Sequence, residues 1–297
     1  MSKYVIDSET LTDIADAIRA KTGDSASMTP LEMPDEIASI SGGDPLFHEK
    51  VGDGNAYLYI YLPTIEHLDV VINVYVPGDA SITIDWGDGS SIDTISTQTM
   101  KEYHTYTAPG YYTIKLTKLS GTPNLGGYSG NSWIFGGSSY PERSQASKLI
   151  GAEFGTWNYS ANELILNSGL CFLYSGESVP NGGANTPYVR ENHELYLLEI
   201  SKNATTVRSY GYASCYNLRE VTVPDNITNI AASAFAGAGA TFHMEPTTPP
   251  TMASTNAFSG NATIYVPYSA DHSVLNAYKT ATNWSNFANN IFEEPEE

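Results

Sequence analysis

The sequence predicts a mainly β, multidomain protein, and three observations lead to this prediction. Short segments between residues 56 and 116 alternate polar and apolar residues and lie between turn signals, which is the pattern of half-buried strands. Beyond residue 195, apolar residues recur with a 23-residue period, as from Leu198 to Val221, and such a period is typical of stacked repeats. Helical spacing is limited to the two ends. We expect a helical segment at 1–44, a β-sandwich at 45–120 and a repeat domain with long loops at 121–297.

The N-terminal segment is expected to contain two short amphipathic helices, with a linker at 41–45. Pro34 interrupts the second helical pattern because proline lacks a backbone donor, so this helix is expected to start near that residue. Helices this short bury little surface, and we expect them to self-associate or to dock on a larger structure. The alternative is a helical hairpin that caps the sandwich. The residues expected to make the attachment are Leu11, Ile14, Ile18, Met33 and Ile37.

The second part is expected to be an antiparallel β-sandwich. The Gly87-Asp88-Gly89 turn ends one alternating segment, because glycine tolerates positive φ and aspartate bonds nearby backbone. In the last strand, Tyr112, Ile114 and Leu116 share one face. Strands are expected over residues 56–62, 70–76, 81–86 and 111–116.

Three motifs in this part resemble the polycystic-kidney-disease (PKD) domain family. They are the Trp86-Gly87-Asp88-Gly89 turn, the His104-Thr105-Tyr106 segment and the strand from Gly110 to Ile114. The resemblance covers about residues 46–119. It implies an immunoglobulin-like sandwich that serves as a spacer or presentation module, with Trp86 in the core and Asp88 in a turn.

Asp85, Asp88 and Asp93 offer a different interpretation, in which their carboxylates bind calcium. The spacing lacks the dense alternation of a calcium loop, and Asp-Gly turns are common without metal. We therefore expect no metal site, and we expect His104 to hydrogen-bond inside the sandwich.

Two stretches, 121–147 and 174–193, are rich in Gly, Ser and Asn and indicate long surface loops. Aromatic residues are scattered through both stretches. Exposed rings can stack on sugars, whereas the more frequent alternative is that they anchor the loops on the core. The candidate binding residues are Tyr128, Trp133, Tyr140, Tyr174 and Tyr188.

The repeat places Val207 in correspondence with Ile230, and Tyr212 with Phe235 and Phe258. Each unit is expected to bury its apolar face on its neighbour. Short strands are expected to end at Pro224 and Pro267.

These repeats resemble leucine-rich repeats of the bacterial surface-antigen class. The resemblance rests on the segment 218–230 followed by Ala234-Phe235, and on the ending over 264–284. It covers about residues 195–292 and implies a solenoid, with Cys215 as a small buried group. Upstream, 150–154 and 164–166 are candidates for degenerate earlier copies. We expect Trp284, Phe287 and Ile291 to seal the last repeat, and 293–297 to be a solvated acidic tail.

The composition excludes several partners. The formal net charge of −19 repels phosphate backbones and anionic lipid surfaces, so neither nucleic acid nor membrane is an expected partner. The 21 tyrosines suit a binding surface, where tyrosine gives contact area at low entropic cost. A disulfide between Cys171 and Cys215 stays open, and two buried thiols are favoured.

The sequence contains no recognisable catalytic constellation. The six histidines lack metal-ligand spacing, and there is neither a nucleophile elbow nor a phosphate loop. Glu191 and Glu194 flank His193, but no second carboxylate motif pairs with them as a glycosidase requires. We expect no enzyme activity, no catalytic residue, no cofactor and no metal.

The N-terminal segment, with Leu11–Arg19 and Lys21-Thr22-Gly23, resembles the leader of many tail-associated phage proteins. The first residues lack a signal core, so we expect synthesis in a host cytoplasm and a place in the virion. The expected function is a tail or fibre appendage that binds a host-surface glycan or protein and other virion proteins. The alternatives are a capsid-decorating or head-fibre protein and a bacterial surface adhesin. The oligomeric state stays open, with a homo-oligomer among the options.

Overall fold

The computed structural model describes residues 50–65, 68–126, 132–135, 148–160, 164–165, 170–181, 185–187, 189 and 192–296. The chain divides into two compact units, Met1–Glu49 and Lys50–Glu297, and the description below concerns the second. The predicted attachment residues Leu11, Ile14, Ile18, Met33 and Ile37 lie outside the described residues.

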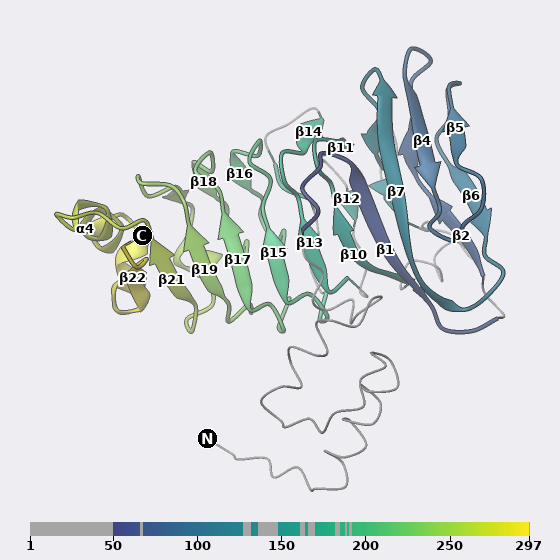
Figure 1. Ribbon diagram of the computed structural model, residues 1–297. Helices are drawn as coiled ribbons and strands as arrows, with labels where there is room; N and C mark the ends of the chain where they lie inside the picture. Colours follow the sequence, from purple (N-terminus) through teal and green to yellow (C-terminus); the bar gives the residue numbers. More distant parts are fainter. Residues whose placement is uncertain are drawn as a thin grey trace, which may run out of the picture. The chain divides into compact units, whose positions relative to one another are not determined.

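The described part is mainly β, as predicted, and one mixed sheet of 11 strands organises it (Figure 1). Neighbouring strands run parallel from β10 to β22 and antiparallel from β10 to β5. In order across the sheet, the strands are β22 (Ile291–Glu293), β21 (Thr263–Val266), β19 (Thr241–Met244), β17 (Glu220–Val223), β15 (Leu197–Glu199), β13 (Phe172–Tyr174), β10 (Leu149–Glu153), β1 (Ala56–Leu62), β7 (Gly110–Ser120), β4 (Ser81–Asp85) and β5 (Asp93–Ile95).

Smaller sheets and short helices complete the described fold, and no helix in it is long and apolar enough to span a membrane. The further strands are β14 (Val179–Asn181), β11 (Asn158–Ser160), β8 (Asn124–Leu125) and β3 (Val74–Tyr75) in one sheet, β16 (Thr206–Val207), β18 (Asn229–Ile230) and β20 (Thr251–Met252) in another, β12 (Leu164–Ile165) with β9 (Ser132–Trp133), and β2 (Asp69–Ile72) with β6 (Glu102–Thr105). The helices are the 3-10 helices η3 (Thr255–Ala257) and η4 (Trp284–Asn290) and the α-helix α4 (Ser273–Thr280).

Strand β4 follows the predicted alternation, but the strand expected over residues 70–76 is a correction: Val70, Val71 and Ile72 are all buried in β2, and Val74–Tyr75 form β3 in a different sheet. In β4, Ile82 and Ile84 are buried while their neighbours are partly exposed. Trp86 is in the core, and its carbonyl accepts a hydrogen bond from the Tyr106 hydroxyl at 2.8 Å. The His104 ring stacks on Trp86 with 4.6 Å between centroids, and its Nε2 lies 2.7 Å from Asp88 Oδ2. The predicted internal hydrogen bond of His104 is therefore confirmed.

Strand β1 corrects the prediction of a half-buried strand. Leu58 and Ile60 enter the main core, but Tyr57 and Tyr59 on the opposite face are also buried. They pack against Phe172 of β13, which no local pattern in residues 56–62 can reveal. Because β1 lies between β7 and β10 in the middle of the sheet, side chains from distant strands cover both of its faces.

The predicted repeat is present as parallel pairing. Leu198 pairs with Val221, and Val207 pairs with Ile230, in the correspondence expected from the period. The rings of Tyr212, Phe235 and Phe258 stack in the core at centroid distances of 5.3 and 5.5 Å.

The upstream segments behave differently from one another. Residues 150–154 contribute to β10, which joins the parallel series through β13. Residues 164–165 pair instead with β9 in a separate two-stranded sheet. Strand β13 was not predicted, although Leu173 occupies the same buried register as Leu198.

The C-terminal end packs largely as expected. Trp284 and Phe287 of η4 are buried and contact Phe258, at centroid distances of 5.5 and 5.9 Å. Ile291 is buried as well, but it belongs to β22, where it pairs with Ile264, rather than to a helix.

The two cysteines, Cys171 and Cys215, are thiols and not a disulfide. Cys215 is fully buried, and its Sγ donates to the Val189 carbonyl oxygen at 3.3 Å. Burial raises the pKa of the Cys215 thiol to about 11. Cys171 is only half-buried, so the expectation of two buried thiols holds for one of them.

Candidate binding face

The face of the parallel strands that points away from the main core carries the candidate site. We call this the outer face. In a strand, successive side chains point to opposite sides, and Leu173, Leu198 and Val221 point inward and are buried. One position further along each strand, the side chains point outward and are partly or largely exposed. These outer-row residues, each in register with the next, are Tyr174, Glu199, Thr222, His243, Tyr265 and Phe292.

Aromatic residues dominate the outer face where parallel and antiparallel strands meet. Phe172 lies 5.3 Å from Tyr59 and 5.7 Å from Tyr174 between ring centroids. Gly151 pairs with Phe172, and a Cβ at Gly151 would lie 2.1 Å from the Phe172 ring. The glycine therefore leaves the space that this ring occupies.

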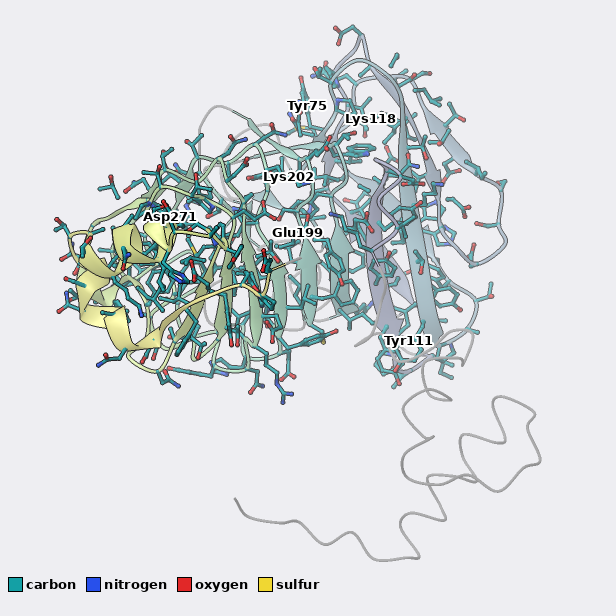
Figure 2. The ribbon with its side chains drawn as sticks, turned by 60° about the vertical axis from the view of Figure 1, so that its left-hand side comes forward. Tyr75, Tyr111, Lys118, Glu199, Lys202 and Asp271 are labelled. Carbon is teal, nitrogen blue, oxygen red and sulfur yellow. The ribbon has the colours of Figure 1, made fainter. Side chains whose placement is uncertain are left out.

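Lys50, Val51 and Gly52 tie the start of the described chain to the outer face. The Val51 and Gly52 amides donate to the Glu153 carboxylate at 2.9 and 2.7 Å. Glu153 is fully buried, and these two donors compensate the cost of burying its carboxylate. Lys50 Nζ forms an ion pair with Glu199 at 2.7 Å, and Figure 2 labels Glu199 on the parallel strands.

Histidine–carboxylate pairs mark the C-terminal end of the outer face. His243 Nε2 lies 3.0 Å from Glu220, and His243 Nδ1 lies 2.6 Å from Glu294. Burial alone would lower the pKa of His243, but hydrogen bonds to Glu294 and Glu220 outweigh it and raise this pKa. His272 Nδ1 lies 2.6 Å from Glu293.

The prediction of a solvated tail over residues 293–297 is therefore wrong for Glu293 and Glu294. Strand β22 pairs with β21, which brings both carboxylates to histidines that precede them by 21 and 51 residues.

A hollow of about 530 Å³ opens beside His243. Its volume lies within the range of small-molecule and side-chain pockets. The lining residues are Thr222, His243, Met244, Glu245, Pro267, Tyr268, Glu294 and Pro295.

Of the predicted binding residues, the structure places Tyr174 in the outer row. The backbone of Trp133 lies in β9, which belongs to a different sheet. Tyr128, Tyr140 and Tyr188 lie outside the described residues. Sequence reasoning missed the rest of the outer row, although Glu199, Thr222 and Phe292 each follow by one residue an apolar position that the sequence analysis identified.

The three aspartates considered for calcium each accept hydrogen bonds from the protein. Asp85 accepts from the Gly87 amide at 3.0 Å, and Asp93 accepts from Trp86 Nε1 at 2.7 Å. Asp88 accepts from the Ser90 amide at 3.0 Å and contacts His104. Among the described residues, no group of three or more His, Cys, Asp or Glu side chains is placed to hold a metal ion.

The structure describes His193 and Glu194 of the group considered for acid–base chemistry. The His193 ring packs against Tyr216 with 5.1 Å between centroids, and Glu194 is exposed. Glu191 lies outside the described residues.

Comparison with known proteins supplies no family for this fold. No model of a protein family matches the chain, and a search of curated proteins finds no match to it.

Proposed function

We propose that this chain is a non-enzymatic structural protein of a bacteriophage virion, a tail or fibre appendage that presents a binding face to the host surface. The observation that carries the proposal is the outer row, because six strands in register hold mostly aromatic and ionisable side chains on one partly exposed face. Tyrosine and phenylalanine at such a face provide contact area with few rotatable bonds.

The finer fold assignment is part of this proposal. A buried Trp86 followed by a turn at Asp88 supports a PKD-like, immunoglobulin-like sandwich for the antiparallel strands. Parallel strands that repeat about every 23 residues, with stacked Phe235 and Phe258, support a leucine-rich-repeat solenoid for the remainder. In this proposal the solenoid contacts a glycan or protein on the host, and residues 1–44 attach the chain to other virion proteins.

Two measurements test the proposal. Electron microscopy of particles labelled with an antibody to the chain is expected to show label at the tail tip. Label over the capsid lattice would favour capsid decoration instead, and label on the bacterial surface without particles would favour a cell-surface adhesin.

The second measurement tests the outer face itself. Replacing Tyr265 and Phe292 together by serine is expected to abolish binding of the purified chain to host cells. Tyr216→Ala is the control, because Tyr216 is an exposed aromatic residue outside the outer row. Equal loss of binding in both variants, or in neither, would contradict a specific role of the outer face.

A further inference from the structure

We propose that the hollow beside His243 binds a lysine or arginine side chain from an extended segment of a partner protein. This inference rests on the proposed binding role of the outer face and specifies the chemistry of the partner. The hollow lies beside the outer row, because Thr222 and His243 are both row members and lining residues.

Charge is the first argument. Glu245 and Glu294 line the hollow, whereas its lining contains no lysine or arginine. Glu245 is exposed and forms no ion pair with any residue that the structure describes. His243 already shares its ring nitrogens between Glu220 and Glu294. The hollow therefore offers a negative charge that the protein does not balance locally, on a chain whose formal net charge is −19.

Hydrogen-bonding capacity is the second argument. An ammonium or guanidinium group has donors only, so it needs acceptors. The carboxylates of Glu245 and Glu294 supply them, while side-chain donors in the lining are limited to Thr222, Tyr268 and His243. An anionic glycan would be repelled by the two carboxylates. The lining thus favours a basic side chain over an anionic glycan.

The walls of the hollow suit the aliphatic stem of such a side chain. Pro267 and Pro295 provide apolar surface, against which the methylene groups of lysine or arginine can pack. Tyr268 is 40% exposed, so its ring is accessible to a cation.

Glu294 is oriented before any ligand arrives. Its Oε1 lies 2.6 Å from His243 Nδ1, and its backbone amide donates to the Val266 carbonyl oxygen at 2.8 Å. Among the described residues Oε2 makes no hydrogen bond, so it can accept one from the ligand. The Glu245 amide donates to the Val223 carbonyl oxygen at 2.9 Å, which fixes the backbone at the other carboxylate. On the protein side, binding therefore has to order mainly the exposed side chain of Glu245.

The test is fluorescence anisotropy of the full chain with a labelled nonapeptide in which lysine alternates with serine. A peptide of the same sequence with acetylated lysines is the matched probe, because acetylation removes the charge. Glu245→Gln is expected to raise Kd for the lysine peptide on the order of fivefold or more. Glu177→Gln is the control variant, because Glu177 is an exposed carboxylate in the β13–β14 turn and its loss changes net charge equally.

Two results are expected. The Kd of the wild type for the acetylated peptide is at least as high as the Kd of the Glu245→Gln variant for the lysine peptide. The Glu177→Gln variant binds the lysine peptide with the wild-type Kd. Equal weakening by both variants would reveal unspecific attraction and overturn the proposal. Displacement of the peptide by spermidine at lower concentration than free peptide would overturn it too, since the hollow would then be a polyamine site. Host-cell binding that survives Glu245→Gln but fails with the Tyr265 and Phe292 variant would leave the proposed function standing and reject only this inference.

Discussion

Gly151 shows how one residue sets the shape of the outer face. The Phe172 ring occupies the space that a side chain at Gly151 would need. This ring packs between Tyr59 and Tyr174 and is almost fully buried. The ring is therefore held on several sides and has little room to move. Close packing of this kind makes a single added methyl group costly.

Gly151→Ala is expected to destabilise the chain by about 1–3 kcal/mol, because the new Cβ would overlap the Phe172 ring. The measurement is urea unfolding followed by tryptophan fluorescence. Gly260→Ala is the control, since a Cβ at Gly260 meets nothing within 4 Å. Equal stability of both variants would mean that Phe172 can leave its position without cost.

Asp88 gives a prediction for pH. Burial alone would raise its pKa, but hydrogen bonds from Ser90 and His104 lower it to about 2 from an ordinary 3.8. A carboxyl whose pKa falls on folding stabilises the native state when ionised. This contribution is present above pH 3.8 and is lost as the pH falls toward about 2.

Asp88→Asn is accordingly expected to lower stability by about 1–2 kcal/mol at pH 7 and to have much less effect near pH 2. Thermal unfolding across this pH range measures the difference. Asp79→Asn serves as the control, because Asp79 is an exposed turn residue. A constant difference between wild type and Asp88→Asn at all pH values would refute the ionic contribution.

At the scale of elements, β22 is the strand whose C-terminal end makes histidine–carboxylate contacts. It is an edge strand of the main sheet, and edge strands tend to fray because one side lacks pairing. Two carboxylates at its end, Glu293 and Glu294, reach His272 and His243. These contacts attach the edge strand to the strands and the helix beside it.

The attachment of β22 is expected to weaken as pH rises. Glu294 and Glu220 face His243 and raise its pKa above the ordinary 6.5. The stabilisation is complete below pH 6.5 and is lost as the pH passes the raised pKa. Because His243 is 41% exposed, solvent screening limits the effect to less than about 1 kcal/mol.

Hydrogen exchange of the β22 amides, corrected for the intrinsic pH dependence of exchange, measures this effect. Opening is expected to be more frequent at pH 8.5 than at pH 6, and His243→Gln is expected to remove the difference. Retention of the pH dependence in His243→Gln would assign it to a group other than His243.

At the scale of the whole molecule, local patterns predicted some elements, such as β1 and β4, but not β13 or the division of residues 70–76 into β2 and β3, and they did not predict long-range contacts. The predicted bounds of β1 match the observed ones, because alternation over 56–62 is a property of that segment alone. The burial of Tyr57 and Tyr59 was not predicted, because it depends on Phe172, which is more than a hundred residues away in the sequence. Regular strand pairing converts distant positions into neighbours, and no single window of sequence contains that information.

The candidate site escaped prediction for a related reason. Periodicity identifies positions that are chemically alike, such as the buried Leu198 and Val221. Their outward neighbours Glu199, Thr222 and His243 differ in chemistry, so they leave no repeat signal. The predicted loop aromatics drew attention to residues 128–188, of which Tyr174 alone joins the outer row among the described positions.

The continuity of the main sheet leads to a prediction about cooperativity. The boundary expected near residue 120 separates β7 from β10, but β1 pairs with both of these strands, and one core cluster contains residues from both sides of this boundary, from Ala56 to Ile291. A fragment of residues 121–297 would lack β1, so the edge of β10 would lose its partner, and Phe172 would lose the cover of Tyr59.

We therefore expect residues 50–297 to unfold in one transition, with coincident midpoints by fluorescence and circular dichroism. We expect fragment 121–297 to unfold without cooperativity. Two separate transitions in the longer chain, with the later one matching a stable fragment, would show instead that the antiparallel and parallel parts of the sheet unfold independently.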